Sequence, residues 1–575
     1  LWGVDSVPAT PGRTAIEMFQ AAADGEVKAL WIVCTNPTQS LPDQTTVRRA
    51  LQRAEFVIVQ EAFATTATCD YADLLLPATT WGEKDGTVTN SERRISRMRA
   101  AVPAPTHPDF PLDGPQDDWR IAQQIGQRLE TVLRPGQPTL LPYVDAQAVW
   151  LEHRESTRGR DLDITGLSYA LLDDLGPQQW PCPESATVAL ATTATSGYQS
   201  LGQARLYADG RFHTADGRAR FAAVAYQPLA EARVSAYPFS LNTGRLRDQW
   251  HGMSRTGTLG RLFGHVPEPV LQMHPQDMSR RGFADGDLVR VSSKRGTLLV
   301  PVQASDELAL TQVFMAMHWG SEVLSGQGAD GQRLAGVNAL TTSAYCPSSK
   351  QPEFKHAAVK VEKADLPWTL VALAWLPPES AHTARAQLVA LMPQLDFATC
   401  VPFGRERTGL LFRAAHTQPP GEGLLCQVEA ALGLGGQDIL RYSDTQRGQR
   451  RALNLVREGG QTLLEGFMLA GDTRAQAWIS TLLKESLPAQ QFGPALLAPG
   501  ATPPVPVAAK GQQVCTCFNV TDAAISQFLS TCDATEPQRL AALQASLQCG
   551  TNCGSCVPQL QRLVRQVPVS AALTA

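Results

Sequence analysis

The stretch Ala29-Leu30-Trp31-Ile32-Val33-Cys34-Thr35-Asn36-Pro37 determines the predicted fold of the first part of the chain. Its apolar first half has the length of a buried β-strand, and its second half consists of loop-forming residues. Two further apolar runs follow at residues 56–59 and 74–77, and apolar residues at helical spacing precede and separate the first two runs. Alternating helices and strands of this kind predict a multidomain α/β protein that begins with a doubly wound parallel sheet.

Polar residues follow these predicted strands directly. Thr35, Asn36 and Pro37 come after the first run, and Glu61 comes after the second. Ligands of open parallel sheets bind at the carboxyl ends of the strands, so these four residues are candidate binding residues. The alternative is that Asn36-Pro37 forms an ordinary turn and that Glu61 is a solvated acid.

A polar, turn-rich segment at residues 82–94 ends in two arginines, Arg93 and Arg94. Guanidinium groups hold phosphates in bidentate geometry, which makes both arginines candidates for binding a phosphorylated ligand. On composition alone, a solvated basic face is the alternative.

Residues 236–364 are predicted to form a second domain that is rich in β structure. Alternating apolar residues at 289–291 and 298–302 flank a Lys-Arg-Gly turn, as in a hairpin with one buried face, and residues 313–317 are typical of a barrel strand. Polar segments interrupt this pattern at residues 242–251, 318–320 and 348–355. In these segments Gly244 allows close backbone approach, and Arg245 and Lys350 are suited to binding an anion.

Residues 365–497 show strand-like runs at 371–376 and 409–412 and a hairpin pattern at 450–469, but no catalytic constellation. We predict a small α+β region here that serves docking. A proline-rich linker at 498–511 separates it from a small helical, cysteine-rich module at 512–570. Residues 1–235 are predicted to form the α/β part that precedes these units.

The last module holds two cysteine pairs, Cys515-Thr516-Cys517 and Cys553-Gly554-Ser555-Cys556, separated by two short amphipathic helix patterns. Four thiolates in this arrangement suit an iron–sulfur cluster or a zinc ion. An iron–sulfur cluster is favoured because zinc sites are more often built from two C-x-x-C pairs. Cys549 could compete for a ligand position, but C-G-S-C is the tighter unit, so Cys549 and Cys532 are interpreted as spare thiols.

The bulk composition excludes several classes of protein. With 575 residues the chain is too long for one core, which predicts about three to five domains. A net charge of −4 gives no general case for nucleic-acid binding, and no apolar run approaches the roughly 20 residues that span a bilayer. Scattered cysteines besides the dense cluster favour a reducing compartment. Because the chain begins with Leu1, we expect a C-terminal piece of a longer protein, whose missing part could carry an export signal.

The cysteine module resembles bacterioferritin-associated ferredoxin, a small helical domain. The resemblance rests on the C-x-C unit at 515–517 and the C-G-S-C unit at 553–556. It implies a one-electron 2Fe–2S relay whose ligands are Cys515, Cys517, Cys553 and Cys556.

Residues 1–360 resemble the molybdopterin oxidoreductase superfamily, in the branch of the nitrate reductases. Several motifs in the family's order carry the resemblance: TNP at 35–37, CDYADLLLP at 69–77, WGEKDG at 81–86, NSERR at 90–94, TGR at 243–245, HPQD at 274–277, GD at 286–287 and SKQPEFK at 349–355. Together with the tail, they are similar to the large catalytic subunit of the cytoplasmic assimilatory nitrate reductases. The segment at 349–355 favours nitrate over formate.

This resemblance implies two molybdopterin guanine dinucleotides that hold molybdenum, with a β-barrel-type domain as the dinucleotide-binding unit. The candidate cofactor-binding residues are Thr35, Asn36, Pro37, Glu61, Asp70, Asn90, Arg93, Arg94, Thr243, Gly244, Arg245, His251, Lys350, Phe354 and Lys355. Arginines would hold the diphosphates, and an acid such as Asp70 or Asp277 would accept from guanine. No catalytic residue and no molybdenum ligand is assigned.

The implied activity is reduction of nitrate to nitrite in the cytoplasm for nitrogen assimilation. Electrons would enter at the tail cluster and pass through a 4Fe–4S cluster on the missing part. The donor would be an NAD(P)H-dependent flavoprotein subunit or a ferredoxin or flavodoxin, with no nucleic-acid or membrane partner. The alternatives are another molybdopterin enzyme, such as formate dehydrogenase or a periplasmic nitrate reductase, and a non-catalytic scaffold with a structural zinc ion.

Overall fold

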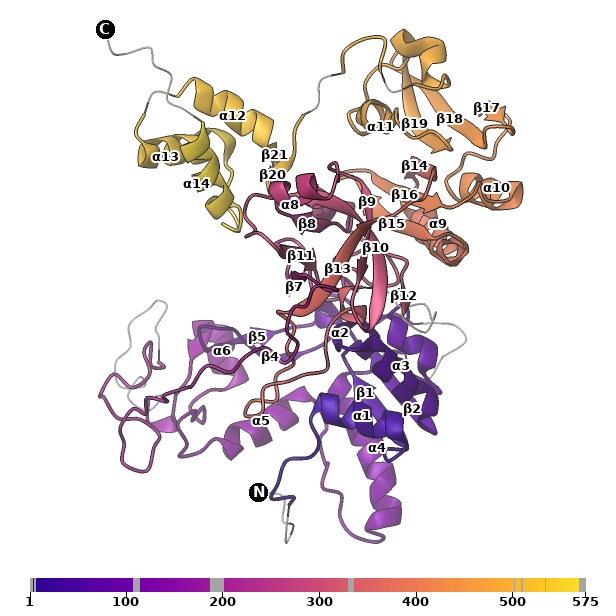
Figure 1. Cartoon of the computed structure of the whole chain (residues 1–575). Helices are drawn as coiled ribbons and strands as arrows, with labels where there is room; N and C mark the ends of the chain where they lie inside the picture. The colour runs from indigo at the N-terminus through magenta and orange to yellow at the C-terminus, as the bar shows by residue number, and fades with distance from the viewer. Residues whose placement is uncertain are drawn as a thin grey trace.

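The structure is a computed structural model that describes residues 4, 7–106, 114–186, 201–328, 336–500, 502–507, 510–532 and 534–567. Figure 1 shows four units in chain order. The α/β unit (indigo to purple) lies below a central barrel (magenta), and the α+β unit (orange) and the tail domain (yellow) lie above it. Our predicted domain boundaries at residues 235, 364, 497 and 511 stay predictions. Each of them lies between helices or strands of successive units.

The α/β unit contains a three-stranded parallel sheet in the order β1 (Ala29–Val33), β2 (Phe56–Glu61) and β3 (Leu74–Pro77). Helices α1 (Ala15–Asp24) and α3 (Gln44–Arg53) pack together and cover one face, with Phe19, Val47 and Leu51 in the core. On the other face Trp31, Val33 and other large apolar side chains are more than 40% exposed. The prediction that β1 and β2 are buried therefore holds for one face only, because the described part of the chain covers only that face.

A second small sheet follows in the same unit. It consists of β4 (Gly86–Thr89), β5 (Arg94–Met98) and the short β6 (Gln178–Gln179), all antiparallel. Helices α5 (Ala146–Ser156) and α6 (Tyr169–Leu175) contact this sheet, and Ile95, Trp150 and Leu172 form its core. In helix α4 (Asp118–Leu133) only Ile121 is buried.

The central unit is a closed six-stranded barrel within the described residues. Its strands are β7 (Phe239–Gly244), β8 (Leu271–Met273), β9 (Leu288–Ser292), β10 (Gly296–Ala304), β11 (Gln312–Ala316) and β13 (Ala357–Lys363). They pair in the order β10-β8-β11-β7-β13-β9, and β9 pairs back to β10, which closes the barrel; β12 (Gln327–Gly328) extends β10 at its edge. Inward residues such as Val291, Leu298 and Val300 are fully buried, so the predicted hairpin and barrel are confirmed.

The α+β unit is one antiparallel sheet in the order β15-β16-β14-β19-β18-β17. Its strands are β14 (Trp368–Leu376), β15 (Phe397–Phe403), β16 (Thr408–His416), β17 (Leu440–Asp444), β18 (Gln449–Glu458) and β19 (Gln461–Ala470). Leu370 and Ala372 face a core shared with helices α9 (Pro378–Leu391) and α10 (Glu422–Ala431). Val371 and Leu373, from the opposite face of β14, belong to the core of the barrel. This sheet is therefore covered on both faces, and the core on one of these faces is continuous with the core of the barrel.

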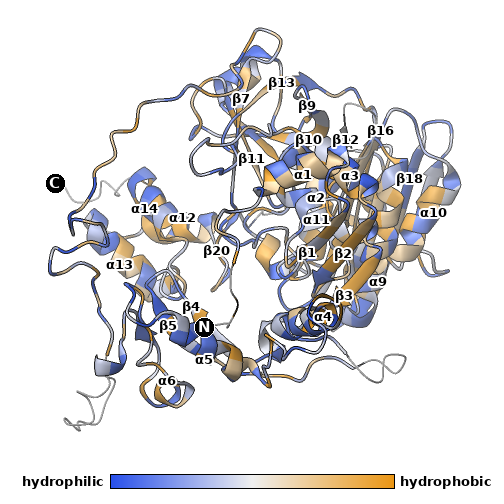
Figure 2. Cartoon of the chain, turned by 90° about the horizontal axis from the view of Figure 1, so that it is seen from below, coloured by the Kyte–Doolittle hydropathy of each residue, from blue (hydrophilic) through white to orange (hydrophobic). Residues whose placement is uncertain are grey.

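The tail domain has a short β-ribbon, β20 (Gln513–Cys515) and β21 (Val520–Thr521), and three helices, α12 (Asp522–Ser530), α13 (Glu536–Leu547) and α14 (Val557–Gln566). Ile525, Leu529, Leu543 and Leu560 form its core. Figure 2 shows apolar (orange) residues concentrated on strands and inner helix faces and hydrophilic (blue) residues on loops and outer helix faces. Across the described ranges, no helix combines the length and the apolar character that crossing a membrane requires.

Leu298→Ala should lower the free energy of unfolding by about 2–5 kcal/mol, because it leaves a cavity inside the barrel. Leu299 is the next residue of β10 and is only half-buried, so Leu299→Ala should cost clearly less. Urea denaturation followed by tryptophan fluorescence measures both changes. Equal losses would contradict the inward–outward alternation of β10.

Candidate functional site

A cavity of about 650 Å³ lies between the α/β unit and the barrel. The loops that follow β1, β2 and β3 form one side, and the loop after β7 and the segment before β13 form the other. The following predicted residues line it: Thr35, Asn36, Glu61, Thr243, Arg245, His251, Phe354 and Lys355. Eight predicted side chains from four separate segments thus meet at one cavity, which we call the cofactor cavity.

Asn36 shapes the loop after β1 with its own side chain. Its Oδ1 accepts from the hydroxyls of Thr38, at 2.9 Å, and Thr68, at 2.6 Å. Its Nδ2 donates to Gln39 Oε1 at 3.2 Å. Gln39 lies in the short helix α2 (Pro37–Ser40) and donates to the carbonyl of His318 at 2.8 Å. The Asn-Pro motif therefore links the parallel sheet to the barrel.

His318 organises the opposite wall. Its ring is fully buried, and its Nε2 accepts from the amide of Leu246 at 2.8 Å. Because Nε2 accepts, Nδ1 carries the proton and donates to the carbonyl of His251 at 2.6 Å. Burial also lowers the pKa of His318, so the ring is neutral near pH 7. One imidazole therefore fixes both ends of loop 246–251.

The cations of the cavity differ in what they contact. Lys84 pairs with Asp118 at 2.7 Å, and Lys355 donates to the carbonyl of Thr243 at 2.6 Å. Among the described residues, no carboxylate pairs with Arg245 or Arg255, although both line the cavity. The Arg255 guanidinium lies 5.9 Å from the Trp81 ring and 5.8 Å from the Trp250 ring, within cation–π range. These two guanidinium groups remain available to an anionic ligand.

Two titratable groups at the cavity have shifted pKa values. Burial raises the pKa of Glu61, and this effect outweighs the hydrogen bonds from the amides of Ala62 and Phe63 and the charge of Arg255, which lower it. Partial burial lowers the pKa of His251, and the charges of Arg245 and Arg255 lower it further. Desolvated acids beside unpaired cations are typical of functional sites.

These features fit a molybdopterin dinucleotide. Its diphosphate is the kind of anion that Arg245 and Arg255 can bind in bidentate geometry. The polar ends of parallel strands provide hydrogen-bonding groups, and Trp81 and Trp250 provide flat apolar surface. The residues present therefore match the chemistry of the cofactor that the sequence implies.

Three predicted residues lie beside the cavity without lining it. Pro37 is buried, and its carbonyl accepts from Gln44 Nε2 at 2.9 Å. A Cβ at Gly244 would come within 2.7 Å of the Phe314 ring, so the close approach made there is to Phe314. Lys350 pairs with Glu17 at 3.4 Å and lies over the Tyr345 ring.

The Asn90–Arg94 segment lies at the β4–β5 hairpin, outside the cavity. The Asn90 carboxamide accepts from the amides of Glu92 and Arg94 and closes the turn. Arg93 donates to the carbonyls of Ala204 and Trp180, and Arg94 pairs with Glu92 at 3.0 Å. The structure thus gives these residues local contacts, and phosphate binding by the arginines stays a prediction.

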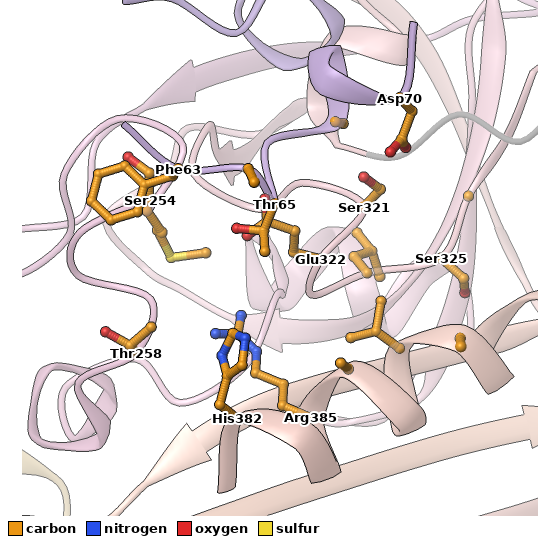
Figure 3. Close-up of a pocket in the computed structure, with 18 of the residues that line it drawn as sticks. Phe63, Thr65, Asp70, Ser254, Thr258, Ser321, Glu322, Ser325, His382 and Arg385 are labelled. Carbon is orange, nitrogen blue, oxygen red and sulfur yellow. The ribbon is translucent and has the colours of Figure 1, made fainter. Parts of the chain in front are cut away.

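Asp70 lines a neighbouring pocket of about 680 Å³ (Figure 3). This pocket lies between the loop after β2, two barrel loops and helix α9, and it shares Phe63 and Ser254 with the cofactor cavity. Figure 3 shows His382 and Arg385 rising from α9 toward Glu322. Burial raises the pKa of Glu322 to about 7. Asp277, the other proposed guanine acceptor, is buried and accepts from the amide of Thr311 at 2.6 Å.

Sequence analysis missed several groups of the cavity. Arg255 lies in a loop without periodicity, so only the proximity of Trp250 could have indicated it. Gln39 follows the Asn-Pro motif by two residues, which marks it as part of the same loop. Asp118 opens helix α4 and accepts from Lys84, Gln60 and Cys34, contacts that no local pattern predicts.

The four predicted cluster ligands converge in the tail domain. Cys515 ends β20 and Cys556 precedes α14, and both are buried. The sulfurs of Cys517 and Cys553 lie 3.4 Å apart, and burial, together with the charge and a hydrogen bond of Cys515, raises the pKa of Cys556. These contacts bring the two cysteine units together, although no group of three or more metal-binding side chains in the described residues gathers around one point. The four-thiolate ligand set therefore stays a prediction.

Cys549 is fully buried in the core of the tail domain, with Leu543 and Leu560. Burial raises the pKa of its thiol to about 11. Its surroundings suit a packed thiol, and its exclusion from the ligand set stays a prediction.

Three parts of the chain match protein-family models. Residues 3–126 match the molybdopterin oxidoreductase family, and residues 239–358 match the molydopterin dinucleotide binding domain. Residues 513–566 match the BFD-like [2Fe-2S] binding domain.

Curated relatives extend these matches. The chain is 32% identical over 588 residues to a nitrate reductase of Klebsiella oxytoca, covering 98% of this chain and 58% of the relative. It is 39% identical over 353 residues to a nitrate reductase of Synechocystis sp., covering 61% and 45%. It is 30% identical over 362 residues to formate dehydrogenase H of Escherichia coli, covering 63% and 44%. The chain spans about half the length of the curated relatives it matches.

The fold, the cavity and the matches together define the class: two regions of the chain match the molybdopterin oxidoreductase family and the molydopterin dinucleotide binding domain, and the tail matches the BFD-like [2Fe-2S] binding domain. Within this class, nearly the whole chain is similar to a nitrate reductase. The superfamily and the fold class predicted from the sequence are confirmed.

Arg245→Ala should reduce the molybdenum and guanine nucleotide content of the purified full-length protein roughly tenfold, because it removes a charge-assisted contact worth about 1.5–3 kcal/mol. Arg128→Ala is the matched control, since Arg128 is an exposed residue of helix α4, outside the cavity and not a candidate ligand. Metal analysis and nucleotide release on denaturation measure the content. Loss of cofactor in the control alone would contradict the assignment of the cavity.

Replacing any one of the four predicted ligands by serine should abolish the visible absorption and the reduced-state EPR signal of the cluster, because a hard hydroxyl replaces a thiolate ligand. The four variants are Cys515→Ser, Cys517→Ser, Cys553→Ser and Cys556→Ser. Cys549→Ser should keep both signals. If the cluster survives in Cys553→Ser and is lost in Cys549→Ser, then Cys549 is the ligand and Cys553 is the spare thiol.

Proposed function

We propose that this chain is part of a molybdenum-dependent nitrate reductase that serves nitrogen assimilation. It would bind molybdopterin guanine dinucleotide in the cofactor cavity and receive electrons through a 2Fe–2S cluster in the tail. The donor would be an NAD(P)H-dependent flavoprotein subunit or a ferredoxin or flavodoxin. A 4Fe–4S cluster elsewhere in the protein would complete the path.

One observation carries this proposal: the similarity to the Klebsiella oxytoca nitrate reductase extends over 98% of the chain and so includes the α+β unit and the tail. The similarity to formate dehydrogenase H covers only 63% of the chain. The cytoplasmic location belongs to this proposal, because scattered cysteines beside one dense cluster are typical of a reducing compartment.

The chemistry explains why the cavity and the cluster occur in one chain. Reduction of nitrate to nitrite takes up two electrons and two protons and releases one water. When bound, the molybdenum cofactor supplies the oxygen-atom transfer, which no side chain can perform. In this proposal Arg245 and Arg255 bind the phosphates, and the His318-supported loop orients Arg245 and His251 toward the cavity. The tail cluster delivers electrons one at a time.

The full-length protein, purified without oxygen, should contain molybdenum and reduce nitrate with reduced viologen as donor. It should not oxidise formate with oxidised viologen under the same conditions. Nitrite formation and viologen absorbance measure the two reactions, and a preparation freed of molybdenum is the control.

Formate oxidation without nitrate reduction would replace the proposed activity by that of a formate dehydrogenase. A protein that lacks molybdenum and holds zinc at the tail would support a structural scaffold. Both results would overturn the proposal.

A further inference from the structure

The cluster-binding loop of the tail is held by a residue of the α+β unit. Arg405 lies in the turn between β15 and β16, far from the tail in sequence. Its Nη1 donates to the carbonyl of Thr516 at 2.7 Å, and its Nη2 donates to the carbonyl of Cys517 at 2.9 Å. One planar guanidinium therefore holds two successive peptide groups of the C-x-C unit.

The barrel contacts the same loop from another direction. The hydroxyl of Thr516 donates to Asp248 Oδ2 at 2.8 Å. Asp248 pairs with Arg247 at 3.2 Å, and their side chains are only 11% and 14% exposed. Arg247 also donates to Gln559 of helix α14 at 3.4 Å. Arg247 and Asp248 belong to loop 246–251, whose ends His318 fixes.

A third contact lies beside these two. Gln512 donates to the carbonyl of His265 at 2.9 Å. Gly264 lies so close to the tail that a Cβ there would be 2.0 Å from Gln513 Oε1. Residues 512–517 are therefore in contact with the barrel and the α+β unit along their length.

Ion pairs at the periphery add little to this arrangement. Arg562 pairs with Glu307, and Lys510 pairs with Glu485. Their side chains are largely exposed except Glu485, and exposed pairs are screened by water and salt. The largely buried contacts of Asp248 and Arg247, together with the two directed hydrogen bonds of Arg405, therefore give the interface its specificity.

The charge at Arg405 has a direct consequence for a cluster in this loop. Reduction adds one electron and changes no covalent bond, so the reduced cluster carries one more negative charge. A nearby cation stabilises this charge. The charge of Arg247 acts on the Cys556 thiol, but Asp248, which pairs with Arg247, acts on Cys553 in the opposite sense. Arg405 binds the carbonyl of Cys517, and the carboxylate near it, that of Glu406, is 90% exposed and screened. Arg405 is therefore a further cation that favours the reduced state.

We propose that Asp248, Arg247 and Arg405 form a seat that holds the cluster-binding loop of the tail against the barrel, and that Arg405 is the positioning residue that raises the reduction potential of the cluster. The proposal rests on the [2Fe–2S] site of the tail and does not depend on the substrate of the enzyme.

Arg405→Ala should lower the midpoint potential of the cluster by about 60 mV, which is a tenfold weaker affinity for the electron. Hydrogen exchange in residues 512–521 should become faster, on the order of tenfold, because the loop is released. Potentiometric titration monitored by EPR and exchange mass spectrometry on the full-length protein measure the two effects.

Arg407→Ala is the matched control. Arg407 lies in the same turn but pairs with Glu465 and lies over the Trp375 ring, and it contacts no described residue of the tail. It should leave both readouts unchanged. Arg405→Lys should lower the midpoint potential less than Arg405→Ala does, because the positive charge stays. Its hydrogen exchange in residues 512–521 should still be faster than in the wild type, because one ammonium cannot bridge both carbonyls.

Thr516→Val removes only the hydroxyl that donates a hydrogen bond to Asp248. It should therefore speed hydrogen exchange in residues 512–521 without shifting the midpoint potential of the cluster. If Arg405→Ala loses its cluster, the exchange rate of Thr516→Val still tests whether the seat holds the loop. Wild-type exchange in both variants would overturn the seat, and faster exchange with an unchanged potential in Arg405→Ala would overturn the electrostatic role. Neither readout uses nitrate, so the result is independent of the proposed activity.

Discussion

A buried hydrogen-bond network around Gln39 and His318 holds the two walls of the cofactor cavity together. Gln39 donates to the carbonyl of His318, and Asn338 donates to the carbonyl of Gln39. The His318 ring then joins the amide of Leu246 to the carbonyl of His251. Because these groups are buried, each one left unpaired would cost about 1–3 kcal/mol. The network therefore sets both the spacing between sheet and barrel and the shape of loop 246–251.

This loop is the point at which the cavity and the tail domain meet. Its flanking residues Arg245 and His251 line the cavity, and Arg247 and Asp248 between them contact the tail. One loop, whose two ends are fixed by one ring, therefore supplies residues both to the cavity wall and to the seat of the tail.

Local patterns predicted local structure well, and they predicted partners poorly. The apolar runs after residues 28 and 55 form β1 and β2, and the turn at 294–296 joins β9 to β10, because hydrophobic periodicity and turn chemistry act over a few residues. Arg93, in contrast, donates to Ala204, and Lys350 pairs with Glu17. Guanidinium and ammonium groups bind carbonyls, carboxylates and phosphates alike, so their type indicates the chemistry but only the fold selects the partner. Residues at strand ends reached the cavity as predicted because parallel strands bring their carboxyl ends to one edge.

The α+β unit explains how a tethered domain can keep a defined position. The sheet of this unit shares a core with the barrel through Val371 and Leu373, so the β15–β16 turn that carries Arg405 is anchored to the barrel by buried side chains. The tail itself is held by few hydrogen bonds, which alone would give weak binding. The proline-rich linker keeps the tail at a high effective concentration near the seat, so weak contacts suffice for docking.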